Sequence, residues 1–180
     1  MKKIVLILPV LFFIVSSCSS DDSSSNSSND NLFVSKILVD NKSFVPSENT
    51  DEDINVSTSF ESGVNNGQAN LRTFHLFNLT PNLSTSESLQ LSIIYPISQS
   101  SINGTYSLKI SDIEVNTAAQ GSYTLGFNSF SFDGGSLSIV DLGNNKFKLT
   151  FNTTKATNGF DSSAQKTITG YCEVSFIVEE

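Results

Sequence analysis

Apolar and polar residues alternate with a period of two through most of this chain. Phe147, Leu149 and Phe151 alternate with polar neighbours, and the same pattern recurs within residues 89–95 and 123–127. Successive side chains of a β-strand point to opposite faces of a sheet, so this period predicts strands with one buried face. No stretch has the apolar spacing of an amphipathic helix of three turns. The chain is therefore expected to be all-β.

Short runs rich in Gly, Asn and Asp separate the alternating segments. Turns are predicted at Asp40-Asn41, at Asp133-Gly134-Gly135 and at Gly143-Asn144-Asn145, where the hairpin signal is strongest. Residues 128–129 are expected to form a bulge or a bend, because the apolar parity changes after them. About eight to ten short strands fit residues 32–180, which predicts an antiparallel β-sandwich or a small antiparallel barrel.

Two glycines each precede a tyrosine by two residues. We expect Gly104 and Gly121 to lie at turns, with Tyr106 and Tyr123 as the first inward residues of the strands that follow. Residues 71–79 are apolar on both parities, which favours a strand covered on both faces.

The amino-terminal residues have a different pattern. Lys2 and Lys3 precede an apolar run over residues 4–15. This run is shorter than the about 20 residues that a membrane-spanning helix needs, and it is typical of a secretory signal. A buried core helix is the alternative, but two lysines before it and a serine tract after it argue against that interpretation.

The apolar run ends at a cysteine. Val15-Ser16-Ser17-Cys18 resembles the bacterial lipobox, in which an aliphatic residue and two small residues precede a cysteine. The thiol of Cys18 would receive diacylglycerol, and cleavage before it would expose an amine to a further acyl chain. Several acyl chains anchor a protein stably where one gives marginal binding. Residues 1–17 are therefore the expected lipoprotein signal peptide, and an ordinary secretory signal with an incidental cysteine is the alternative.

A polar tract follows the cysteine. Ser19, Ser20, Asp21 and Asp22 resemble the Ser-plus-acidic export tag of Bacteroidota lipoproteins, which implies the outer face of the outer membrane. The periplasmic face is the alternative location. The tract continues to residue 31 without an aliphatic or aromatic side chain, so residues 18–31 are expected to be a disordered tether before the domain at 32–180.

The charge balance excludes one class of partner. The formal net charge is −8, and the basic residues form no stripe along the sequence. Nucleic-acid binding is therefore not expected, because it depends on a basic surface that neutralises phosphates. Electrostatic attraction to anionic lipids is not expected either, which leaves the lipid on Cys18 as the predicted contact with the membrane.

The second cysteine is expected to be structural. If Cys18 carries lipid, Cys172 is the remaining thiol and no intramolecular disulfide can form. Cys172 shares its parity with Ile168, Val174 and Phe176, which places it on the apolar face of a strand. A reactive nucleophile is the alternative, but no histidine or basic residue lies near it in sequence to lower the pKa of its thiol.

The single histidine, His75, shares its parity with Phe77 and Leu79, which favours a core or rim position. No Gly-x-Ser-x-Gly elbow accompanies it, and it cannot complete a zinc site with Cys172 alone. The sequence also lacks a phosphate loop, a dinucleotide fingerprint and a Cys-x-x-Cys motif. No cofactor is therefore expected.

Acidic residues offer one weak candidate for a cation site. Asp51, Glu52 and Asp53 are adjacent in a predicted loop, where Ca²⁺ could relieve their repulsion, although a solvated loop is the favoured interpretation. Nothing in the sequence pairs the remaining acids of the domain as in a glycosidase, among them Asp112, Glu114 and Asp133.

Three segments together resemble a lipoprotein family. GSYTLGFNSFSFDGGSLSIVDLGNNKFKLTFNTT, the later KTITGYCEVSFIV and the earlier ILVDNKSF resemble small β-rich lipoproteins of flavobacteria and their relatives. In that family a glycine-led strand precedes an aromatic strand, and an Ile-Thr-x-Gly-type strand closes the domain. This chain differs in beginning its aromatic strand with Asn-Lys-Phe. The resemblance spans most of residues 33–178 and implies a fold and a location, but no catalytic residues.

These observations together predict a lipid-anchored envelope protein with a binding or structural role, and no enzymatic activity. A glycan, a peptide or an envelope protein is the expected ligand, and the absence of Trp weakens the glycan version. The alternatives are a carboxylate-dependent hydrolase of envelope glycans and an inhibitor or accessory subunit of an outer-membrane complex.

Overall fold

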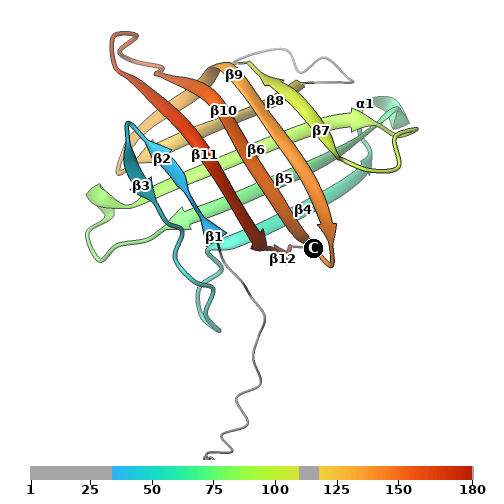
Figure 1. Ribbon diagram of the computed structural model, residues 1–180, viewed down its shortest axis with the longest axis horizontal. Helices are drawn as coiled ribbons and strands as arrows, with labels where there is room; N and C mark the ends of the chain where they lie inside the picture. Colours follow the sequence, from blue (N-terminus) through green and yellow to red (C-terminus); the bar gives the residue numbers. More distant parts are fainter. Residues whose placement is uncertain (1–33, 110–117, 180) are drawn as a thin grey trace, which may run out of the picture. The chain divides into compact units, whose positions relative to one another are not determined.

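The computed structural model describes residues 34–109 and 118–179, which form one compact unit (Figure 1). The predicted signal peptide, the anchor Cys18, the export tag and the tether lie outside the described residues. The strands are β1 (Val34–Ser35), β2 (Ile37–Val39), β3 (Lys42–Phe44), β4 (Val56–Gly63), β5 (Ala69–Asn78), β6 (Glu87–Pro96), β7 (Gly104–Leu108), β8 (Ala118–Leu125), β9 (Asn128–Gly143), β10 (Lys146–Asn158), β11 (Gln165–Ser175) and β12 (Ile177–Val178).

The all-β fold predicted from the alternation is confirmed. The only helical elements in the described residues are the single turns α1 (Val64–Gly67) and η1 (Leu83–Thr85). The strands form one sheet, in the order β12-β4-β5-β6-β8-β7-β9-β10-β11-β2-β3, with β1 beside β11. Most pairings are antiparallel as predicted, but β7 and β8 are parallel, as are β4 and β12, so the sheet is mixed. Twelve strands occur in the described residues, because very short segments also join the sheet.

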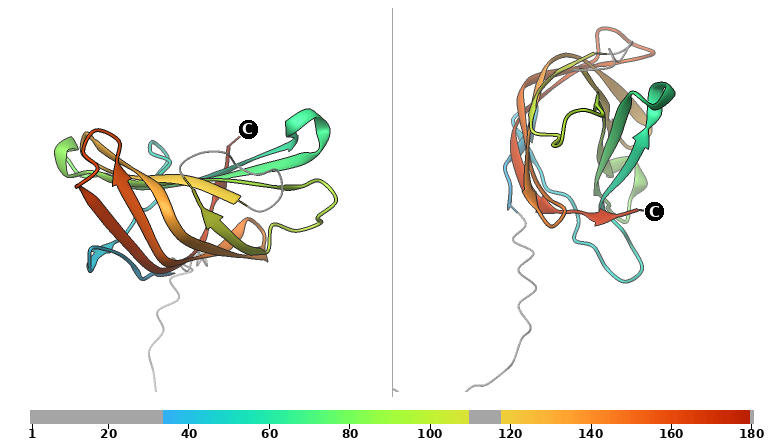
Figure 2. Two further views of the ribbon diagram at one scale, coloured as in Figure 1. Left: turned by 90° about the horizontal axis from the view of Figure 1, so that it is seen from above. Right: turned by 90° about the vertical axis from the view of Figure 1, so that its right-hand side faces the viewer.

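The sheet curls so that its two halves face each other (Figure 2). Strands β4, β5 and β6 form one wall, and β9, β10 and β11 form the other (Figure 1). The chain after β11 crosses to β4 at Phe176, which is buried. The rings of Phe74 from one wall and Phe147 from the other lie 5.0 Å apart, and that of Phe176 lies 5.1 Å from Phe74. These three rings pack between the two walls and join them across a shared core. We call the face of the sheet that packs against this core the inner face.

The connections divide between two ends of the sheet. The β5–β6 connection contains η1, and the β8–β9 turn lies beside it, since Gly126 N–H donates to the carbonyl of Ser86 at 2.8 Å. We call this the η1 end. The β4–β5 turn contains α1 and lies at the opposite end of these strands, which we call the α1 end.

Two predicted hairpin turns are confirmed. Asp40 and Asn41 join β2 to β3 with φ angles of 48° and 64°. Asn144 and Asn145 join β9 to β10 with φ angles of 52° and 57°. Positive φ at both central residues gives the turn the twist of the flanking strands, and Asn and Asp tolerate this conformation better than other residues with a side chain.

The bulge or bend predicted at residues 128–129 is wrong, because these residues lie in a regular part of β9. The chain turns instead at Gly126 and Phe127, and Leu125 pairs directly with Asn128 across a two-residue hairpin. The change of apolar parity marks the reversal of the chain between β8 and β9. Parity alone cannot separate a bulge from a two-residue turn, since both shift the inward positions.

The turn predicted at Asp133-Gly134-Gly135 is also wrong. Strand β9 continues through these residues, and its register with β10 shifts there. Gly135 has a φ of 88°, and a Cβ on it would lie 2.5 Å from the carbonyl oxygen of Thr153. The glycines therefore serve a bulge at which the two paired strands bend together, consistent with the curl of the sheet.

Gly104 begins β7 as expected, but Gly121 lies inside β8 and not at a turn. A Cβ on Gly121 would come within 2.7 Å of the Phe132 ring and 2.5 Å of the Gln90 carbonyl oxygen. The glycine thus admits a core ring close to the backbone. The expected inward positions of Tyr106 and Tyr123 are confirmed, since both are buried.

Candidate functional site

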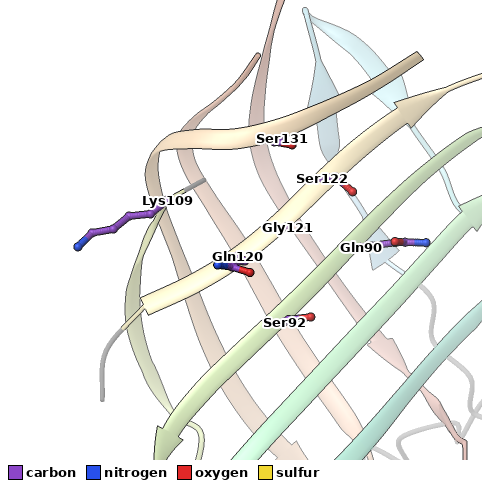
Figure 3. Close-up of a pocket in the computed structure, with 7 residues that line it drawn as sticks. All are labelled: Gln90, Ser92, Lys109, Gln120, Gly121, Ser122 and Ser131. Atoms are coloured by element: carbon purple, nitrogen blue, oxygen red, sulfur yellow. The ribbon is translucent and has the colours of Figure 1, made fainter. Parts of the chain in front are cut away.

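A shallow hollow of about 240 Å³ lies on the outer face of the sheet, over the middle of β6 and β8 and the start of β9 (Figure 3). Its lining combines hydroxyl and amide side chains with one lysine and one glycine: Gln90, Ser92, Lys109, Gln120, Gly121, Ser122 and Ser131.

Strand register explains why these polar groups meet. Gln90 pairs with Ser122, Ser92 pairs with Gln120, and Ser122 pairs on its other side with Ser131. Directly opposed residues of neighbouring strands share a face, so all five side chains lie together. Their neighbours in the sequence are core residues such as Leu91 and Phe132, which the alternation directs to the inner face.

The lining is suited to hydrogen bonding. Serine hydroxyls and glutamine amides each donate and accept hydrogen bonds. Among the described residues that line the hollow, none is a carboxylate, a histidine or a cysteine. The hollow therefore offers neutral donors and acceptors beside one lysine, which suits recognition of a polar ligand more than acid–base or nucleophilic chemistry.

A second polar cluster lies on the inner face at the η1 end. Tyr123 donates a hydrogen bond from its hydroxyl to Glu87 Oε1, and Asn78 Nδ2 donates to Glu87 Oε2 at 3.1 Å. Burial raises the pKa of Tyr123 above its usual value, and the hydrogen bond to Glu87 raises it further. Each carboxylate oxygen has a partner, so this cluster closes the margin of the core.

Cys172 is a core residue, as predicted. It is fully buried on β11, opposite Leu149 of β10. Burial raises the pKa of its thiol to about 12, and a hydrogen bond with the Leu149 backbone opposes that shift only in part. Such a thiol is neither exposed nor ionised at neutral pH, which argues against a nucleophilic role.

His75 lies on the outer face of β5 and not in the core. It is half-buried, pairs with Ser57 and Gln90 across the sheet, and meets the ring of Phe77 edge-on at 6.0 Å. Residues 71–79 are therefore not covered on both faces, since Phe74 and Leu76 are buried whereas His75 and Phe77 are only half-buried. His75 lies beside the hollow but does not line it.

Asp51, Glu52 and Asp53 lie on an exposed turn. The backbone N–H groups of Glu52 and Asp53 donate to Thr50 Oγ1 at 3.3 and 2.9 Å. Within residues 34–109 and 118–179, no group of three or more His, Cys, Asp or Glu side chains is arranged to hold a metal ion.

The other acids noted in the sequence do not converge in the described part of the chain. Asp133 is exposed and accepts a hydrogen bond from the Thr157 hydroxyl. Asp112 and Glu114 lie outside the described residues, as do Cys18 and residues 19–22.

Sequence reasoning missed the hollow for an identifiable reason. The alternation had placed Gln90 and Ser92 on a solvent face, where polar residues are ordinary. The informative signal is the run of small or amide side chains at matching parity in 90–92 and 120–122. That signal has meaning only once β6 and β8 are known to pair.

Comparison of the chain with family models, with curated proteins and with solved structures found no match. Among the helical segments of the described residues, none has the length and apolar character needed to cross a membrane.

Proposed function

We propose that this chain is a lipid-anchored protein of the bacterial outer membrane, displayed at the cell surface, whose β-domain binds a neutral polar ligand in the outer-face hollow. The observation that carries the binding role is the convergence of five neutral hydrogen-bonding side chains from three strands. The order of positive residues, apolar run, lipobox and polar tract supports the address.

The hollow favours a neutral glycan segment or peptide backbone. Both present closely spaced donors and acceptors, which the Gln and Ser side chains can match. A glycan hydrolase would need two carboxylates facing the ligand, and the described lining has none. The domain is therefore proposed as a binding module that holds its ligand without converting it.

The binding role is tested in the hollow itself. The double variant Gln90→Ala/Gln120→Ala removes two amides from opposite sides, and Gln165→Ala removes an exposed glutamine on β11 as the matched control. A panel of neutral envelope glycans and peptides is titrated by calorimetry. We expect the double variant to bind about tenfold or more weakly, which corresponds to about 1.4 kcal/mol. Equal affinity in all three proteins would contradict the proposal, and turnover of a bound glycan would support the hydrolase alternative.

The anchor is tested separately. Cys18→Ala is expected to lose incorporation of labelled fatty acid and to leave the membrane fraction, whereas Cys172→Ala keeps both. Acylation of the Cys18→Ala protein would contradict the lipobox interpretation. Replacing Asp21 and Asp22 with Ala is expected to reduce cleavage by protease added to whole cells while acylation continues, and unchanged cleavage would count against the export tag.

A further inference from the structure

The only arginine of this acidic chain, Arg72, lies on the inner face of the sheet. It pairs with Phe60 of β4 on one side and Ile93 of β6 on the other. Ile93 is fully buried in the core, and opposed residues share a face. Arg72 therefore projects from the inner face, in the half of β5 that is nearer the α1 end.

Two aromatic rings hold the guanidinium group. Its central carbon lies 4.9 Å from the centroid of the Phe60 ring and 5.5 Å from that of Phe147. Phe147 is buried on the opposite wall, whereas Phe60 is 47% exposed. The cation is thus positioned between a core ring and a ring that solvent can reach, and such stacking limits the rotation of the side chain.

The hydrogen-bonding capacity of Arg72 is unused by the described residues. None of them accepts a hydrogen bond from its guanidinium group or forms an ion pair with it, and its Nε atom is buried without a partner. A guanidinium group has five N–H donors in a planar fork that matches a carboxylate in bidentate geometry. A buried donor without an acceptor is unfavourable, so a structural role alone leaves this arrangement unexplained.

The neighbouring polar side chains do not supply that acceptor. One row closer to the α1 end, Ser62 Oγ donates to Asn70 Oδ1 at 2.9 Å, and Asn70 interacts in turn with the hydroxyl of Tyr95. Burial lowers the pKa of Arg72, and the charges of Tyr95, when it is ionised at high pH, and of Asp141 oppose this shift. Asp141 shares the inner face with Phe147, but it forms no ion pair with Arg72.

We infer that Arg72 is the anion-recognising residue of a second binding site, on the inner face at the α1 end, for a monocarboxylate that carries an apolar group. The carboxylate would fill the open fork of Arg72, and the apolar group would pack on the exposed side of Phe60. A single negative charge fits best, because one cation is present and the carboxylate of Asp141 disfavours a dianion such as phosphate. This site shares no residue with the outer-face hollow, so either can fail without the other.

The test uses the Cys18→Ala protein, which is expected to lack the lipid anchor, and N-acetylphenylalanine as the probe, with its uncharged amide and glucuronate as comparison probes. Binding is measured by NMR titration. We expect saturable binding of N-acetylphenylalanine, at least tenfold weaker binding of the amide, and weaker binding of glucuronate, which has the carboxylate without the apolar group. The comparison of these probes distinguishes recognition of the carboxylate from binding through the apolar group alone.

Three variants assign the binding to Arg72. Arg72→Met keeps the apolar stem but is expected to lose tenfold or more in affinity, and Arg72→Lys, which keeps the charge without the fork, is expected to bind weakly. Lys148→Met is the matched control, because Lys148 projects from the outer face of β10, where it stacks on Tyr171 at 4.6 Å. Unchanged affinity in Arg72→Met would overturn the inference. So would equal binding of the amide or no saturable binding to the unsubstituted protein, and Arg72→Lys decides the matter if Arg72→Met does not fold.

Discussion

Two charged residues on the inner face, Glu87 at the η1 end and Arg72 at the α1 end, occupy comparable positions at opposite margins of one core. They project from the adjacent strands β6 and β5 and border the same apolar interior. Both oxygens of Glu87 accept hydrogen bonds, from Tyr123 and from Asn78. Among the described residues Arg72 has only aromatic rings as partners.

We call the Glu87 end of the core the closed margin, because its charged group has hydrogen-bond partners within the protein. We call the Arg72 end the available margin, because its charged group has none among the described residues. At the η1 end the protein satisfies its own charge, so the cluster fixes strand ends and offers little to a ligand. At the α1 end two rings position the charge of Arg72, but none of the described residues accepts a hydrogen bond from it. Polar groups at the margin of a core are thus structural or functional according to their partners and not according to their burial.

The largest effect is expected at the centre of the core, which both margins share. Phe74→Ala removes a ring that packs on Phe147 at 5.0 Å and on Phe176 at 5.1 Å. We expect a loss of about 3–5 kcal/mol in the free energy of unfolding, as for other buried aromatic truncations. Urea denaturation followed by tyrosine fluorescence and circular dichroism measures it. Two separate transitions would show that the ends do not depend on one core.

A smaller effect is expected at the closed margin. Glu87→Ala leaves the hydroxyl of Tyr123 and the amide of Asn78 without their acceptor. The expected loss is about 2 kcal/mol in the free energy of unfolding, measured by the same denaturation. Glu61→Ala removes an exposed glutamate from β4 and should change stability by no more than about 0.5 kcal/mol. Equal values for the two variants would mean that the Glu87 cluster is not structural.

Alkaline pH should weaken the closed margin further. Burial and then Glu87 raise the pKa of Tyr123 in the folded state, so the folded protein keeps a proton that the unfolded chain releases above about pH 10. Stability is fully present below that pH and falls above it, by up to about 1.4 kcal/mol per pH unit for one tyrosine. Denaturation curves at successive pH values should show a shallower fall for Tyr123→Phe. Part of the fall remains, because burial also raises the pKa of Tyr95 and Tyr106.

The smallest change in stability is expected at the available margin. Arg72→Met keeps an unbranched stem over the Phe147 ring and removes the unpartnered Nε. The free energy of unfolding should change by no more than about 1 kcal/mol, since no ion pair or hydrogen bond to a described residue is lost and the removal of the buried Nε offsets the loss of the two ring contacts. A loss as large as that of Glu87→Ala would make the two margins equivalent and would assign Arg72 to stability.

Local patterns were sufficient for several features of the fold. The parity of Phe147, Leu149 and Phe151 predicted their burial, and the parity of Cys172 predicted a core thiol. The Asn145 turn was evident because few residues tolerate its backbone conformation. Each feature depends on residues close together in the chain, which is why the sequence carries it.

Glycine positions and changes of apolar parity were ambiguous wherever two backbone conformations are compatible with the same local sequence. Gly135 permits either a turn or a bulge, and the bend was decided by Thr153 on the neighbouring strand. The parity change near residues 128–129 fits a bulge or a hairpin equally well. A partner strand decides such cases, and its identity lies outside the local sequence.

The sequence by itself determined that this chain forms strands and, for most of them, which side is apolar. Only the tertiary structure decided that Gln90, Gln120 and Ser131 share one hollow, and that Arg72 stacks on Phe147 from the opposite wall. The physical reason is the separation along the chain of the residues that interact. Side-chain alternation is fixed by the backbone geometry of neighbouring residues, whereas both sites depend on pairings and sheet curvature that bring distant segments together.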